Sequence, residues 1–178
     1  MVKKVLINIT LIFIAFVIYF LQSNFFSWFS IAGIKPNLFV IYILWIGLFG
    51  NRIMGIAYGL SIGLFLDVIF CEKIGANLLG LTLIGFLAIL FDRNFSKDSR
   101  MTIMSMVFGA TIIFEVVILI MNYIMYGTNV EVWQFIRILI VEVIYNIMIT
   151  IIIYPILQRF GYVIENEYKG NKILTRYF

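Results

Sequence analysis

Long unbroken runs of Leu, Ile, Val and Phe are the feature of this sequence that most limits its fold. Several runs approach the roughly 20 residues that a helix needs to cross about 30 Å of hydrocarbon. In lipid every backbone N–H and C=O must be paired within the protein, so a spanning chain is either a helical bundle or a closed barrel. Barrel strands would alternate polar and apolar residues over roughly ten positions. The runs therefore predict an all-α integral membrane protein.

Six such segments can be placed along the 178 residues of the chain. We predict transmembrane helices at residues 5–21, 38–49, 53–70, 74–91, 101–126 and 132–157. Residues 1–157 then form one membrane domain, and residues 158–178 form a basic and aromatic tail that serves either as an interfacial anchor or as a docking surface for a cytoplasmic partner. A content of 63% hydrophobic and 12% charged residues agrees with a bundle of about six helices. No small-residue cleavage site follows the first segment, so we expect it to be retained as a helix.

The basic residues separate into two groups on this arrangement. With the N-terminus in the cytoplasm, ten of them lie on inner segments, whereas the outer loops hold only Lys35 and Lys73. Cytoplasmic loops of membrane proteins carry such an excess of Lys and Arg, which predicts that both termini are cytoplasmic. This placement also explains the net charge of +4 without a nucleic-acid partner. The ten inner residues are Lys3, Lys4, Arg52, Arg93, Lys97, Arg100, Arg159, Lys169, Lys172 and Arg176.

The sequence offers little for catalysis. It has no His and one cysteine, Cys71, so neither a Cys/His metal site nor a His-dependent hydrolytic triad is supported. Asp92 and Asp98 in one short loop are too sparse for metal-assisted phosphoryl or acyl transfer. We therefore predict a protein that is not an enzyme, with no catalytic residues, no metal site and no cofactor.

Three glycines follow one another at four-residue spacing in the third segment, at Gly55, Gly59 and Gly63. Four helical residues turn about 400°, so these glycines form one narrow stripe along the helix. Small residues allow two backbones to approach closely, which is a main source of helix association in lipid. The stripe predicts a helix-packing surface, filled either by a neighbouring helix of the same chain or by the helix of a partner protein.

A set of polar side chains lies within the predicted spans. Asp67 falls near the outer end of the third helix, and Glu115 and Glu142 fall at nearly the same depth on the last two helices. An unpaired acid in hydrocarbon costs roughly 2.5–3.5 kcal/mol, so each should face a partner or a wet cavity. We predict a network of these three acids with Asn146 and the intramembrane cation Arg137. If the two glutamates face each other without Arg137, they should share a proton.

Three segments together carry a resemblance to a known family. Leu21–Ser23 closes the first helix, Ala32–Leu38 opens the second, and the stretch from Arg52 to Asp67, RIMGIAYGLSIGLFLD, is followed by Gly75. Over most of its length the chain resembles the MreD family of rod shape-determining membrane proteins of bacteria. One difference is Asn37, where members often carry an acid.

The resemblance implies a non-enzymatic component of the cell-wall elongation machinery, located in the bacterial cytoplasmic membrane, that maintains rod cell shape. Such proteins look like multi-pass partners of the bitopic protein MreC, linking peptidoglycan synthases outside to actin-like MreB filaments inside. The glycine stripe or the polar seam would then receive the helix of an MreC-like partner. The family is also similar in size and helix count to the substrate-binding subunits of energy-coupling-factor vitamin transporters. In that alternative the intramembrane acids and Asn146 would line a pocket for a small solute.

Overall fold

A computed structural model of the chain describes residues 2–70, 75–127 and 131–169. The described part is helical and contains no strand. In chain order the helices are α1 (Val2–Phe20), the π-helical turn η1 (Leu21–Phe25), α2 (Phe26–Trp28), α3 (Leu38–Phe49), α4 (Arg52–Phe70), α5 (Ala76–Asn94), α6 (Arg100–Tyr126) and α7 (Val132–Lys169).

The prediction of an all-α, multi-pass membrane protein is confirmed. Five helices are long and apolar enough to cross a membrane, and α3 is a shorter apolar helix. The start predicted for the fourth span, Ile74, lies outside the described residues, as do Lys73, Lys172 and Arg176. The last helix does not end at residue 157 but continues through Pro155 to Lys169. A proline removes one helical hydrogen bond, and tertiary contacts on either side, such as that of Leu157 O with the indole of Trp45 at 2.8 Å, hold the helix together.

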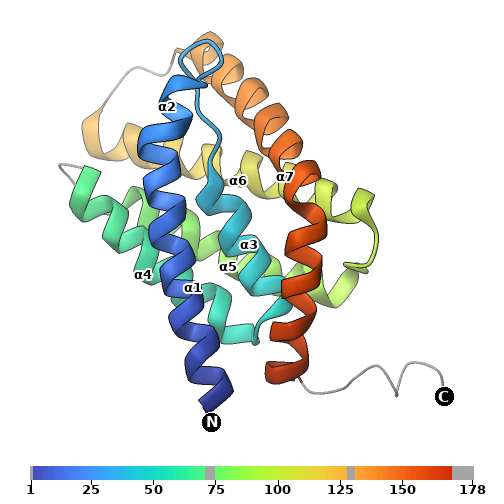
Figure 1. Cartoon of the computed structure of the whole chain (residues 1–178). Coiled ribbons are helices and arrows are strands. Elements are labelled where there is room, and N and C mark those ends of the chain that lie inside the picture. Colours follow the sequence, from blue (N-terminus) through green and yellow to red (C-terminus); the bar gives the residue numbers. More distant parts are fainter. Residues whose placement is uncertain (1, 71–74, 128–130, 170–178) are drawn as a thin grey trace.

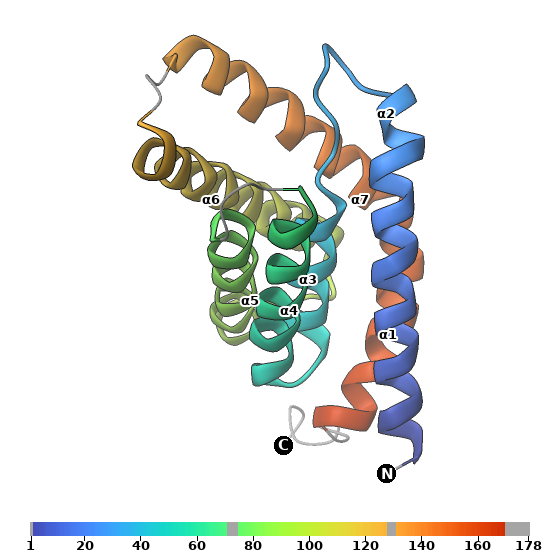
Figure 2. The ribbon, with the colours of Figure 1, turned by 90° about the vertical axis from the view of Figure 1, so that its left-hand side faces the viewer.

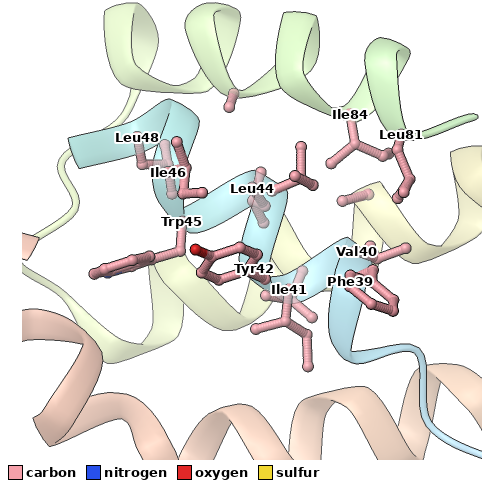
Figure 3. Packing of buried hydrophobic residues seen from close by; sticks show 14 of the residues in the cluster. Phe39, Val40, Ile41, Tyr42, Leu44, Trp45, Ile46, Leu48, Leu81 and Ile84 are labelled. Atoms are coloured by element: carbon pink, nitrogen blue, oxygen red, sulfur yellow. The ribbon is translucent and has the colours of Figure 1, made fainter. Parts of the chain in front are cut away.

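Helix α3 forms the centre of the protein, because all twelve of its residues are buried. A helix that is apolar on every face has no side suited to contact with water or with polar groups, so it is stable only when other helices enclose it. Figure 1 shows α3 surrounded by α1, α4, α5 and α7. Figure 3 shows side chains of α3, including Val40 and Leu44, gathered beneath Leu81 and Ile84 of α5.

The C-terminal end of α3 is closed by two lysines. The carbonyl oxygen of Leu48 accepts hydrogen bonds from Lys97 Nζ at 3.1 Å and from Lys169 Nζ at 2.7 Å. Both ammonium groups also pair with Asp92, at 2.9 and 2.7 Å, and Lys97 pairs with Glu165 at 2.6 Å. Burial tends to lower the pKa of Lys97, but the hydrogen bonds from Glu165 and Asp92 outweigh it and raise the pKa above its ordinary value. Cations are favourable at a helix C-terminus, and this cluster joins α3, the α5–α6 loop and the end of α7.

Helix α1 lies along the outside of the bundle (Figure 2). Leu11 is its one buried residue. Three tyrosine hydroxyls bond to α1: Tyr42 donates to Leu11 O at 2.6 Å, Tyr58 donates to Asn8 Oδ1 at 3.1 Å, and Tyr168 donates to Lys4 O at 3.2 Å. Most of the surface of α1 therefore faces outward, where the membrane lies.

The start of α1 and the end of α7 lie at the same end of the molecule, opposite the connection between α2 and α3 (Figures 1 and 2). This arrangement agrees with an even number of crossings. That this end faces the cytoplasm stays a prediction from the distribution of basic residues.

Candidate functional site

The glycine stripe of α4 lies directly against α5. A Cβ atom added at Gly59 would lie 2.5 Å from Leu81 O, and one at Gly63 would lie 2.5 Å from Leu78 Cα. At Gly55 it would lie 2.8 Å from the backbone of α3 and 3.1 Å from that of α5. These separations are shorter than carbon atoms tolerate, so only hydrogen fits at the three positions. The two backbones are in contact along the whole stripe, and α4 and α5 form the most extensive helix pair of the described chain.

Glycines of the neighbouring helices complete this contact. A Cβ atom at Gly85 of α5 would collide with the backbone of Gly55, and one at Gly47 of α3 would collide with Ala88. Three helices therefore meet where Gly47, Gly55 and Gly85 come together. The stripe is filled by the protein's own helices, and at these positions it offers no groove to a partner.

A second row of small residues lies on another face of α4. Ala57 and Ser61, four residues apart, are exposed and line a crevice of about 300 Å³ between α1 and α4. Ala15 and Phe16 of α1 line the opposite wall, and Phe65 contacts Phe16 edge to face with ring centroids 5.9 Å apart. The crevice is apolar and lies at the middle of both helices. Because small residues at four-residue spacing favour close helix contact in lipid, this surface is suited to a further helix.

Asp67 is fully buried and holds the N-terminal end of α5. Its Oδ2 accepts from Gly75 N at 2.8 Å and from Leu78 N at 3.0 Å, and its Oδ1 accepts from the backbone and side-chain nitrogens of Asn77 at 3.0 and 2.9 Å. Four donors thus surround one carboxylate at a helix N-terminus, where negative charge is favoured. Asp67 links the end of α4 to the start of α5, and these bonds involve none of the other predicted network residues.

Glu115 of α6 and Glu142 of α7 are brought together. They are 9% and 7% exposed, and their two side chains interact with each other. The side chains of Asn37 and Asn146 also hydrogen-bond to Glu142. Asn146 itself is fully buried and donates from Nδ2 to Thr111 Oγ1 at 3.0 Å. The predicted polar seam between the last two helices is therefore present, with Thr111 as a member that the sequence interpretation did not include.

The seam also closes the N-terminal end of α3. Asn37 N donates to Asn146 Oδ1 at 2.8 Å, and Leu38 N donates to Gln22 Oε1 of the π-helical turn at 3.1 Å. Asn37 Oδ1 caps the helix by accepting from Val40 N at 3.4 Å. Asn37 and Gln22 were missed as site residues, although both lie in segments that carried the family resemblance. Their amide side chains satisfy backbone groups that would otherwise be buried without partners.

Arg137 does not join this seam, which corrects the predicted network. Its Nη2 donates to Ala32 O at 3.4 Å in an exposed position, and no ion pair of the described residues joins it to Glu115 or Glu142. Arg137 precedes Glu142 by five residues, and five residues turn a helix by about 500°, which points the two side chains to different faces of α7. Depth in the membrane alone did not reveal this difference in direction.

The described residues contain no group of three or more His, Cys, Asp or Glu side chains that would hold a metal ion. The site thus consists of helix-packing surfaces and a buried, largely satisfied polar seam. Such an arrangement suits assembly and support of a membrane bundle.

Comparison with known proteins adds the family. The family model described as rod shape-determining protein MreD matches residues 3–163, which include α1 to α6 and most of α7. No curated protein and no solved structure matches the chain. The family match spans nearly the whole membrane domain and agrees with the resemblance seen in its sequence segments. The chain belongs to the MreD family of rod shape-determining membrane proteins.

Proposed function

We propose that this protein maintains rod cell shape as a non-enzymatic scaffold that binds the spanning helix of a bitopic MreC-like protein in the bacterial cytoplasmic membrane. The observation that carries the proposal is the family match over residues 3–163, together with five membrane-capable helices. Through this partner the protein would connect cell-wall synthases outside to actin-like MreB filaments inside. The end of α7 and the α5–α6 loop would face the filaments, because the basic residues concentrate there.

The crevice between α1 and α4 is the surface that best fits the partner's helix. The glycine stripe of α4 is already filled by α5, so it leaves no space for a further helix. In contrast, Ala57 and Ser61 present a small-residue row to the membrane, and the crevice beside them has room for the side chains of one helix ridge. Helix α1 adds a long apolar wall, since its surface is largely exposed. A partner helix in this position would contact α1 and α4 together.

The alternative of a vitamin-like solute site has less support. Both carboxylate oxygens of Asp67 are occupied by backbone and side-chain donors of α5. Glu115, Glu142 and Asn146 are buried against one another. The crevice that is large enough for a small molecule is lined by none of these four residues.

The test is co-purification of the co-expressed MreC-like protein in a mild detergent. Ser61→Trp fills the crevice, whereas Ile140→Trp adds the same side chain to α7, at a site that is 50% exposed. We expect Ser61→Trp to lose the partner while thermal unfolding remains cooperative, and Ile140→Trp to keep it. In cells, Ser61→Trp should fail to restore rod shape after depletion of the native protein. Full retention of the partner by folded Ser61→Trp would contradict the proposed interface.

A further inference from the structure

We propose that the Glu115–Glu142 pair is a proton-binding site, in which one shared proton holds α6, α7 and the N-terminal end of α3 together. This inference does not depend on the partner-binding proposal, because the pair lies apart from the α1–α4 crevice. The ligand of this site is a proton, and the family match gives no indication of a proton-binding site.

The buried seam cannot hold two negative charges. Two carboxylates within hydrogen-bonding distance repel each other strongly in a buried setting, so both cannot be ionised at once. One proton converts the repulsion into an O–H···O hydrogen bond between Glu115 and Glu142. Asn37 and Asn146 then stabilise the remaining negative charge with their amide groups. The N-terminal end of α3 lies beside it and contributes the positive end of its dipole.

One carboxyl oxygen of the seam is unsatisfied. Glu142 Oε1 is buried without a hydrogen-bond partner in the described structure, on a side chain that is only 7% exposed. A buried acceptor left unpaired is unfavourable. Protonation of this carboxyl group removes the buried negative charge that the unpaired oxygen would otherwise share. The orphan atom therefore lies where a proton is needed.

A metal ion fits the seam less well than a proton. Calcium and magnesium take about six or more oxygen ligands. Here the amide oxygens of Asn37 and Asn146 already accept from the backbone nitrogens of Val40 and Asn37, and Thr111 Oγ1 accepts from Asn146. The described residues supply no third acid to this place. The remaining oxygens belong to two carboxyl groups, which suffice for a proton and are too few for these cations.

No other described charge faces the pair. Asn37 before α3 and Asn146 on α7 contact Glu142, and Thr111 on α6 contacts Asn146; none of these three side chains titrates. Arg137 bonds to Ala32 instead. The charge state of the seam is therefore controlled by the two glutamates themselves.

Release of the proton should weaken the contact between α6 and α7. Ordinary glutamates of an unfolded chain carry no proton at neutral pH, so unfolding would release the proton held by the folded pair. By linkage, the stability of the folded protein then falls as the pH rises. The Glu115→Gln/Glu142→Gln variant imitates two protonated side chains and leaves no acid in the seam, so its stability should fall less than that of the wild-type protein as the pH rises above the ordinary glutamate pKa of about 4.3.

The direct test is infrared spectroscopy of the purified protein, scanned for the C=O band of a protonated carboxylic acid while the pH is varied. We expect the wild-type protein to show this band at neutral pH and the Glu115→Gln/Glu142→Gln variant to lack it. Glu131→Gln, which changes an exposed acid, should keep the band.

Unfolding measured against pH supplies a second readout for variants that fold poorly. Wild-type stability that falls as the pH rises, together with a smaller fall for the Glu115→Gln/Glu142→Gln variant, would support the proposal. Absence of the infrared band from the wild-type protein at neutral pH would overturn it. Stabilisation by added Na⁺ or Mg²⁺ that is lost in Glu142→Gln would likewise overturn it in favour of a metal-ion site.

Discussion

Substitution of Gly59 by alanine tests whether the stripe of α4 is a packing surface. The added Cβ would lie 2.5 Å from Leu81 O, whereas ordinary van der Waals contact begins at 3.4 Å, so the two helices must separate by about 0.9 Å. The nearby atoms are backbone atoms of α5, which cannot rotate away as a flexible side chain would. Overpacking of this kind costs about 1–3 kcal/mol.

A matched control is available at Gly109 in α6. A Cβ atom there would meet only the ring of Phe91, at 3.8 Å, which is an ordinary contact. Alanine is favoured over glycine inside a helix by about 0.8–1.0 kcal/mol, and this gain applies to both positions. Gly109→Ala should therefore stabilise the protein by about 1 kcal/mol. Because the helix-propensity gain cancels in the comparison, the free energies of unfolding of the two variants should differ by about 1–3 kcal/mol.

The assay is reversible unfolding of the purified protein in detergent mixed with increasing SDS, followed by circular dichroism. Gly59→Ala should unfold at a lower SDS fraction than Gly109→Ala. Equal stability of the two variants, or greater stability of Gly59→Ala, would show that α4 and α5 do not pack backbone to backbone at this point.

Three further outcomes follow from the structure. Asp67→Ala leaves the buried donors at the start of α5 without an acceptor, so thermal unfolding in detergent should reveal a loss of about 1–3 kcal/mol or more, and a stability equal to wild type would contradict the cap. Lys97→Met removes the ammonium group from Leu48 O and two acids, and a double-mutant cycle with Glu165→Gln should give a coupling of about 0.5–3 kcal/mol. Since the pKa of Lys97 is raised, this coupling should be present below the ordinary lysine pKa and disappear only at more alkaline pH; a coupling near zero at neutral pH would contradict it. In a Cys71→Ser background, the variants Lys35→Cys and Ser96→Cys should be labelled by a thiol reagent from opposite sides of the membrane, with position 96 on the cytoplasmic side. Labelling of both positions from the same side would contradict the predicted topology.

Much of the fold could be predicted from the order and spacing of residues along the chain. Apolar runs located the helices, because a lipid-spanning backbone must satisfy its own hydrogen bonds. Four-residue spacing identified the glycine stripe, since it determines which side chains share a helix face. Equal depth placed Glu115 and Glu142 at one level, and in the structure their side chains interact. In each case the property depends on position within a single helix.

Other features depended on how helices are rotated and combined. Arg137 and Glu142 point to different faces of α7 because of the helical turn between them. A comparison of their depths in the membrane does not take this turn into account. The partner of the glycine stripe is α5, which no spacing within α4 could specify. The extension of α7 beyond residue 157 depends on tertiary contacts that compensate for Pro155 and for the charged residues that follow.

The length of α7 is explained by the shortness of α3. Twelve residues rise about 18 Å, so α3 cannot cross about 30 Å of hydrocarbon, and both of its ends lie within the protein. Backbone groups exposed at such ends need partners that lipid does not provide. Helix α7 supplies them at both ends, with Asn146 bonded to the N–H of Asn37 and Lys169 bonded to the carbonyl of Leu48. If the last helix ended at residue 157, it would not carry Lys169 to the C-terminal end of α3. The continuation of α7 therefore brings Lys169 beside Lys97 at the C-terminal end of the core helix.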